Sequence, residues 1–291
     1  MALDSMREIF DRMAEEGKPF WEIVLETDME ERQVTRNQSM AKMLTMWQAM
    51  SDAADGYTGR RRSVSGLVGG DGMKMRQYNL RGEAMTGGYV SEVIAEALSM
   101  AESNACMGRI VAAPTAGACG VLPAVLLPLC KYEELSQHQL LEALYVASGI
   151  GAVIAYRACI AGASGGCQAE IGTASAMAAG ALVALRGGDG QQIGHAVAMA
   201  LKNLMGLVCD PVAGLVEVPC IKRNVVGAVN AVSCANMALA GVDYAIPCDE
   251  VIDAMGRVGS LLSPDLRETG QGGLAATPTG VKIARQLAQE G

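Results

Sequence analysis

The sequence of 291 residues contains few aromatic side chains and few charges. Aromatic residues make up 4% of the chain and charged residues 19%, whereas 51% of the residues are hydrophobic. No sustained alternation of apolar and polar residues is present, so half-buried strands are not indicated. Because the apolar content is high and the net charge per residue is low, intrinsic disorder is excluded. The 35 glycines and 9 prolines follow no period, which excludes a collagen-like chain.

Basic residues are in the minority. The net charge is −8, from 23 Lys and Arg against 31 Asp and Glu. A nucleic-acid-binding protein needs a basic face to neutralise phosphates, so this balance predicts no nucleic-acid partner. The basic run Arg60-Arg61-Arg62 is short and favours a solvated loop or a contact between chains. The N-terminus lacks the apolar stretch of a signal peptide, which predicts a cytoplasmic protein.

Two stretches, 143–163 and 110–130, are apolar over about the length of a membrane span. The first contains Arg157, and three prolines interrupt the second. Neither is flanked by the aromatic residues that mark membrane interfaces. Both are therefore predicted to be buried helices of a protein without a membrane segment.

Helical signals recur along the chain. Ser5 with Glu8 and Ser136 with Gln139 have the spacing of capping boxes, and the apolar face of 37–54 predicts a helix. Later segments alternate Ala-rich helical patterns with tight glycine loops, and no repeat or linker divides them. The sequence therefore predicts an all-α fold, a single compact domain of buried Ala- and Gly-rich helices joined by glycine loops.

The nine cysteines contain no C-x-x-C pair, so neither a zinc ribbon nor a thioredoxin-type redox pair is indicated. Most are expected to be small buried hydrophobic residues. Three of them, Cys167, Cys209 and Cys220, lie in or beside turns marked by glycine or proline. Three thiolates without a fourth can hold a [4Fe–4S] cluster and leave one iron open as a Lewis acid. From the spacing alone this signal is weak, and three merely buried thiols are the favoured alternative. Four others lie in runs predicted to be helical: Cys106, Cys130, Cys159 and Cys234.

Three strings carry a resemblance to a known family. GASGGCQAEIG at 162–172, LVCDPVAGLVEVPCIKRN at 207–224 and APTAGACG at 113–120 resemble the alpha chain of the iron–sulfur-dependent L-serine dehydratases. The resemblance spans 63–280, so 1–62 is expected to form an N-terminal helical segment of one catalytic domain covering 1–291. It implies an all-α domain and three ligands of a [4Fe–4S] cluster, namely Cys167, Cys209 and Cys220.

The resemblance also implies an activity. Members convert L-serine to pyruvate and ammonia without pyridoxal phosphate: the open iron acts on the serine hydroxyl while a base removes the α-proton. Single-chain relatives carry an additional N-terminal regulatory domain, which implies a separate beta chain and an oligomer here. Some relatives end in a cysteine that can occupy the active site, whereas this chain ends in Ala288-Gln289-Glu290-Gly291.

Other site residues are predicted with alternatives open. Lys74 follows the glycine loop 69–72 and could bind the substrate carboxylate or act as a base, or it could be a solvated lysine. Lys202 stands where some relatives carry histidine, and Glu170 could be a neighbour of the cluster or only a charge at a helix start. A cradle for the substrate carboxylate, or else the cap of a helix starting near Val121, is predicted at Thr115, Ala116, Gly117 and Ala118.

Three other functions remain open from the sequence. A related cluster could remove sulfide from L-cysteine instead of water from L-serine. A non-catalytic iron–sulfur subunit would need a fourth ligand, such as Cys119 or Cys248. A pyridoxal-phosphate dehydratase would need a lysine that forms a Schiff base.

Overall fold

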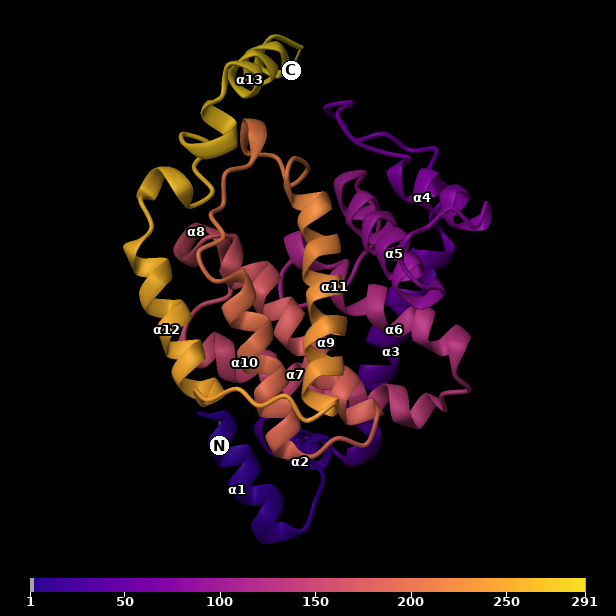
Figure 1. The fold of residues 1–291 in the computed structure, drawn as a ribbon, viewed down its shortest axis with the longest axis vertical. Helices are drawn as coiled ribbons and strands as arrows, with labels where there is room; N and C mark the ends of the chain where they lie inside the picture. The colour runs from indigo at the N-terminus through magenta and orange to yellow at the C-terminus, as the bar shows by residue number, and fades with distance from the viewer. Residues whose placement is uncertain (1–2, 291) are drawn as a thin grey trace.

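Helices make up almost all regular structure in the computed structural model, which describes residues 3–290 (Figure 1). The only β-type pairing among these residues is one isolated bridge between Cys209 and Arg267, so the predicted all-α class is confirmed. The helices are α1 (Met6–Glu16), α2 (Phe20–Arg32), α3 (Arg36–Asp55), α4 (Asp71–Leu80), α5 (Gly88–Ala105), α6 (Val121–Tyr132), α7 (Gln137–Arg157), α8 (Gly162–Gly165), α9 (Thr173–Leu185), α10 (Gly190–Leu204), α11 (Cys220–Leu239), α12 (Cys248–Leu261) and α13 (Pro278–Glu290). Short turns of helix lie at η1 (Ala116–Ala118), η2 (Gln168–Gly172), η3 (Val212–Gly214), η4 (Pro264–Leu266) and η5 (Gly273–Ala276).

The core is built around α9, which packs against α7, α10 and α11. Nearly every α9 residue is buried, and most are alanine or another small residue. Small side chains let the helix backbones approach closely. A Cβ at Gly180 of α9 would collide with Ile150 of α7, and one at Gly227 of α11 would lie 2.8 Å from Ile171 Cγ2. The Ala- and Gly-rich composition therefore reflects close helix packing.

The apolar helix α7 is the one described helix long and apolar enough to cross a membrane by length and composition. In the fold, 67% of its apolar window is buried by neighbouring helices. It ends at Arg157, which forms an ion pair with Asp253 at 2.7 Å. The other apolar stretch is not one helix, because α6 begins only at Val121 after a loop that contains the cis peptide Ala113–Pro114.

Capping residues mark where two of the predicted helices begin. Ser136 and Gln139 form the full capping box at the start of α7, as predicted. At α1, Ser5 Oγ accepts a hydrogen bond from Glu8 N at 3.0 Å, but the Glu8 carboxylate accepts from Asp4 N instead of completing the box. The predicted cap therefore forms with one of its two bonds.

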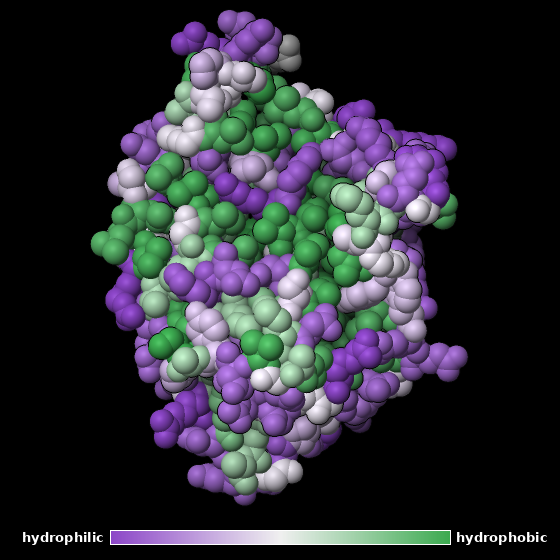
Figure 2. Space-filling view, viewed as in Figure 1, coloured by the Kyte–Doolittle hydropathy of each residue, from purple (hydrophilic) through white to green (hydrophobic). Residues whose placement is uncertain are grey.

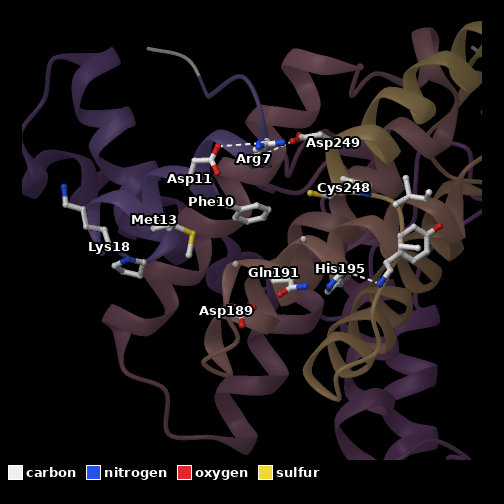
Figure 3. Close-up of a pocket in the computed structure, with 18 of the residues that line it drawn as sticks. Arg7, Phe10, Asp11, Met13, Lys18, Asp189, Gln191, His195, Cys248 and Asp249 are labelled. Atoms are coloured by element: carbon white, nitrogen blue, oxygen red, sulfur yellow. Dashed lines mark hydrogen bonds and ion pairs between the residues drawn. The ribbon is translucent and has the colours of Figure 1, made fainter.

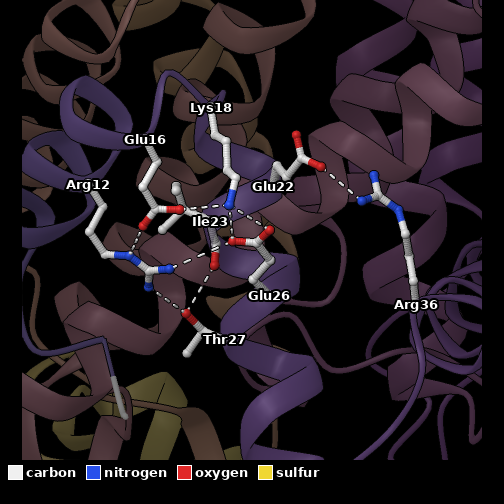
Figure 4. Close-up of polar contacts among 8 residues, drawn as sticks. All are labelled: Arg12, Glu16, Lys18, Glu22, Ile23, Glu26, Thr27 and Arg36. Carbon is white, nitrogen blue, oxygen red and sulfur yellow. Dashed lines mark hydrogen bonds and ion pairs between the residues drawn. The ribbon is translucent and has the colours of Figure 1, made fainter.

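An ionic network fastens α1 to α2 at the lower end of the molecule (Figure 4). Lys18 Nζ lies 2.8 Å from carboxylate oxygens of both Glu16 and Glu26, and Arg12 Nε donates to Glu16 at 2.9 Å. Arg12 also donates to Thr27 Oγ1 at 3.2 Å. The buried faces of α1 and α2 join the same core as α7, so the N-terminal helices are packed against the segments that follow.

Candidate functional site

Three of the nine thiols come together from separate parts of the chain. Cys167 precedes the π-helical turn η2, Cys209 lies in the loop after α10, and Cys220 is the first residue of α11. Their residues are 2%, 3% and 9% exposed. They lie close enough together to affect one another's ionisation: both other thiols raise the pKa of Cys209, and Cys167 raises that of Cys220. The fold thus assembles the trio selected from the sequence.

The remaining cysteines are scattered. Cys130 and Cys234 lie within α6 and α11, as predicted. The prediction of helix for the other two was wrong, because Cys106 and Cys159 come just after the ends of α5 and α7.

Burial dominates the chemistry of the thiol trio. It raises the pKa of Cys167 to about 11 and that of Cys220 to about 12, and it raises the pKa of Cys209 further. Neighbouring negative groups add to the effect, while the Arg223 guanidinium opposes it at Cys167. Without added positive charge the three groups are therefore neutral thiols near pH 7. Binding of a cationic metal centre would compensate for their deprotonation.

The donor set fits a cluster better than a single ion. Among residues 3–290, no three His, Cys, Asp or Glu side chains converge on a point where one metal ion could bind. In a [4Fe–4S] cluster each thiolate binds a different iron, so the three sulfurs need not meet at one point. Three buried thiols also favour soft metals over the hard cations that prefer oxygen.

The segment from η4 to η5 holds the Cys209 loop in place. Cys209 N donates to Leu266 O and Glu268 N donates to Cys209 O, both at 2.8 Å. Asp210 Oδ2 accepts a hydrogen bond from Leu274 N, also at 2.8 Å. The backbone on both sides of this thiol is therefore tied to a segment more than fifty residues away in the chain.

Two carboxylates meet beside Cys209. Thr115 Oγ1 donates to Glu170 Oε1 at 2.6 Å. A Cβ at Gly162 would lie 2.8 Å from Glu170 Oε2, 3.2 Å from Cys209 Sγ and 3.3 Å from Glu268 Oε2. Burial raises the pKa of Glu170 and the charge of Glu268 raises it further, against the lowering effect of the Thr115 hydroxyl. Glycine at position 162 leaves room for these groups to face one another.

The loop 115–118 is fastened to the cysteine site by Asn224 of α11. Its side-chain amide donates to Gly117 O at 2.8 Å and to Cys220 O at 3.0 Å, and its oxygen accepts from Gly120 N at 2.9 Å. Gly120, not Thr115, immediately precedes α6. Thr115 and Gly117 both lie against the Glu170 carboxylate.

Comparison of the sequence with known proteins shows which family it matches. The family model described as serine dehydratase alpha chain matches residues 15–275. The probable L-serine dehydratase alpha chain of Bacillus subtilis (strain 168) is 42% identical over 97% of this chain and 94% of its own length. The L-serine dehydratase alpha chain of Peptoniphilus asaccharolyticus is 41% identical over 99% of both.

The chain belongs to the serine dehydratase alpha-chain family. The family match begins at residue 15, well before the boundary at 63 that the motifs gave. Some members are longer: L-serine dehydratase 2 of Escherichia coli (strain K12) is 46% identical over 62% of this chain but only 40% of its own length.

The two lysines predicted to be catalytic lie on exposed surfaces of this family member. The Lys74 side chain is 71% exposed and forms an ion pair with Asp71 at 2.8 Å. Lys202 is exposed near the end of α10, with Nζ 3.7 Å from the Met205 sulfur. The structure does not give either side chain the burial that a lysine base needs. Their catalytic roles stay predictions.

The sequence reasoning overlooked Arg223 and Glu268. Arg223 donates to Val208 O at 2.5 Å and to Asp210 Oδ1 at 2.9 Å, and its positive charge lowers the pKa of the Cys167 thiol against the effect of burial. Its position three residues after Cys220 was the available signal, since residues with this spacing share a helix face. Glu268 adopts the left-handed backbone conformation, with φ of 65°, and no local pattern marks it.

The largest described cavity lies elsewhere (Figure 3). It has a volume of about 980 Å³ and lies between α1, the start of α10 and the segment 244–249. The start of α10 is separated from the Cys209 loop by its 15 residues, a length of about 22 Å. Apolar side chains such as Phe10 and Met13 dominate its lining. Cavity size alone would therefore have pointed away from the thiol trio.

Proposed function

We propose that this chain is the catalytic alpha chain of an L-serine dehydratase. The reaction eliminates water from L-serine, and the resulting aminoacrylate takes up water to give pyruvate and ammonia. One observation carries the proposal: three buried thiols from separate segments meet beside the Glu170 carboxylate. Relatives that match this chain over nearly its full length carry the name of this activity.

A [4Fe–4S] cluster is the proposed cofactor. Cys167, Cys209 and Cys220 would hold it, because buried thiols suit iron and each would bind a different iron of the cluster. When bound with one iron free of protein ligands, it supplies a Lewis acid for the serine hydroxyl. This chemistry needs no pyridoxal phosphate.

Glu170 is the proposed base. The Thr115 hydroxyl holds Oε1, which leaves Oε2 directed toward Gly162 and Cys209. From that position Oε2 could take the α-proton of a serine bound beside the thiols. Burial raises the pKa of this carboxyl, which makes its carboxylate form a stronger base.

The loop 115–118 would bind and orient the substrate carboxylate. Asn224 fixes the loop through Gly117 O and Gly120 N, so its backbone is positioned before substrate arrives. Backbone N–H groups of tight turns can bind carboxylates in this way. The segment that pairs with the Cys209 backbone adjoins the thiol trio and would limit the entry of water there.

A separate beta chain is the proposed partner, in an oligomer located in the cytoplasm. Two full-length relatives are named alpha chains, and longer relatives extend well beyond the matched region. Apolar side chains gather on the face over the upper ends of α11 and α12 (Figure 2). Exposed apolar residues in these elements and the adjoining loops are Val216, Val226, Leu261 and Leu274. Such a surface is typical of a protein contact.

The test is anaerobic reconstitution with iron and sulfide, followed by iron analysis and a serine-to-pyruvate assay with the beta chain. Wild type should bind about four irons and turn over serine. Cys167→Ala, Cys209→Ala and Cys220→Ala should each lose both properties, whereas the control Cys130→Ala should retain them. Iron bound equally by all variants would refute the ligand assignment, and turnover of L-cysteine but not serine would support the desulfidase alternative.

A further inference from the structure

We infer that Arg223 is a positioning residue that holds the three cysteine-bearing segments together before any cofactor binds. The inference rests on the proposed function, because it concerns the same thiol trio. It adds a role that the cysteines themselves cannot perform, because Cys167, Cys209 and Cys220 are free thiols that no disulfide joins. The arrangement in the chain without metal must therefore depend on other side chains.

Arg223 reaches all three segments. It follows Cys220 by three residues on α11, so both side chains lie on the same face of the helix. Its guanidinium donates to Val208 O at 2.5 Å and to Asp210 Oδ1 at 2.9 Å, the residues on either side of Cys209. The guanidinium also lies near the thiol of Cys167, whose pKa its positive charge lowers.

The contacts form a connected set. Asp210 accepts from Leu274 N through its second oxygen, at 2.8 Å. Asp210 therefore links Arg223 to the segment that pairs with the Cys209 backbone. The side chains of Arg223 and Asp210 are only 16% and 9% exposed. Water can replace these bonds only poorly, and their loss should loosen the Cys209 loop.

The geometry requires arginine and not merely a positive charge. A guanidinium has five donors in a fixed planar fork and can bind several separated acceptors at once. Lysine would keep the charge but concentrate its donors on one nitrogen. We therefore expect Arg223→Lys to retain attraction toward Asp210 while losing the simultaneous bond to Val208 O.

The experiment uses the full chain without metal and measures how fast each cysteine reacts with N-ethylmaleimide, by peptide mass spectrometry. In Arg223→Met, Cys209 should react about tenfold faster than in wild type, because bonds to a charged group are lost. Arg223→Lys should fall between the two. The matched control is Lys222→Met, whose 56% exposed side chain pairs with Asp71, and it should react like wild type.

Iron uptake after reconstitution is the second measurement, and circular dichroism establishes that each variant is folded. Arg223→Met should bind less iron than wild type at equal thiol content. If Arg223→Met fails to fold, the Arg223→Lys variant decides the question. The inference is overturned if Cys209 in Arg223→Lys reacts at the same rate as in wild type. Unchanged reactivity with lost serine turnover would place Arg223 on the substrate and also overturn it. If wild type itself takes up no iron, the proposed function fails, whereas the reactivity comparison still decides the role of Arg223.

Discussion

Two glycine-containing loops show how the same sequence signal can have different outcomes. The loop 69–72 and the loop 115–118 both look suited to cradle an anion. In the first, the backbone N–H groups of Gly70, Asp71 and Gly72 donate to the Glu102 carboxylate at 3.0, 2.8 and 3.4 Å. The Tyr57 hydroxyl donates to the same carboxylate. This cradle is already filled by the protein's own buried glutamate.

The second loop has a carboxylate beside it rather than inside it. Glu170 binds the Thr115 hydroxyl through one oxygen, while the other lies near Cys209 and Glu268. Glu102 is 1% exposed and surrounded by donors, whereas Glu170 is half-buried next to groups that disfavour its charge. A fully satisfied carboxylate stabilises the fold, and an incompletely satisfied one retains capacity for chemistry. This contrast gives the first loop a structural role and supports the role proposed for the second.

The largest expected effect tests the role proposed for Glu170, the carboxylate beside the loop 115–118. Glu170→Gln removes the proposed base but keeps the size of the side chain and an acceptor for Thr115. We expect kcat for serine to fall by about 10²- to 10⁴-fold in the reconstituted enzyme. The free energy of unfolding should change little, or rise, since a raised pKa means that the charged form is disfavoured in the folded protein. An unaltered kcat would remove Glu170 from the mechanism.

The next largest effect tests the structural role of Glu102, the carboxylate inside the loop 69–72. Glu102→Ala leaves three backbone N–H groups and the Tyr57 hydroxyl without their buried partner. We expect the free energy of unfolding to fall by about 3 kcal/mol, measured by denaturant titration of the protein without metal. Glu102→Gln, which keeps one acceptor, should lose less. If Glu102→Ala were as stable as wild type but inactive, the roles of the two loops would be reversed.

Signals confined to a few residues predicted the structure well. Ser136 and Gln139 form their capping box, and the small residues of the predicted helices give an all-α core. The thiol trio came from the family resemblance and is assembled by the fold. The capping box and the all-α core could be predicted because the residues that create them are adjacent in the chain or recur along one helix, whereas the role of the three cysteines as ligands stays a prediction.

Contacts between residues far apart in the chain could not be predicted from the sequence. Glu102 lies 31 residues from the Asp71 N–H that it binds, and no sequence pattern near either residue predicts this hydrogen bond. Lys74 follows a glycine loop, yet the fold directs its side chain to solvent. Glu268 reaches the cysteines only because its backbone pairs with Cys209. Such contacts are set by how helices pack, which a single sequence does not specify.

The smallest expected effect concerns the surface of the first loop. Asp71 forms ion pairs with Lys222 at 2.7 Å and Lys74 at 2.8 Å, and hydrogen bonds to these lysines lower its pKa. A lowered pKa contributes stability that is present above the unfolded value, about 3.9, and lost as pH falls through the folded value. Because both lysines are exposed, Asp71→Asn should cost less than about 1 kcal/mol.

Denaturant titrations of wild type and Asp71→Asn at pH 7 and near pH 3 check this estimate. The difference in unfolding free energy should shrink at the lower pH and with added salt, because both weaken the ion pairs. Serine turnover by Asp71→Asn should equal that of wild type, since the pairs lie on the solvent side of a cradle filled by Glu102. A large loss of turnover would instead give Lys74 and its loop the catalytic role that the sequence predicted.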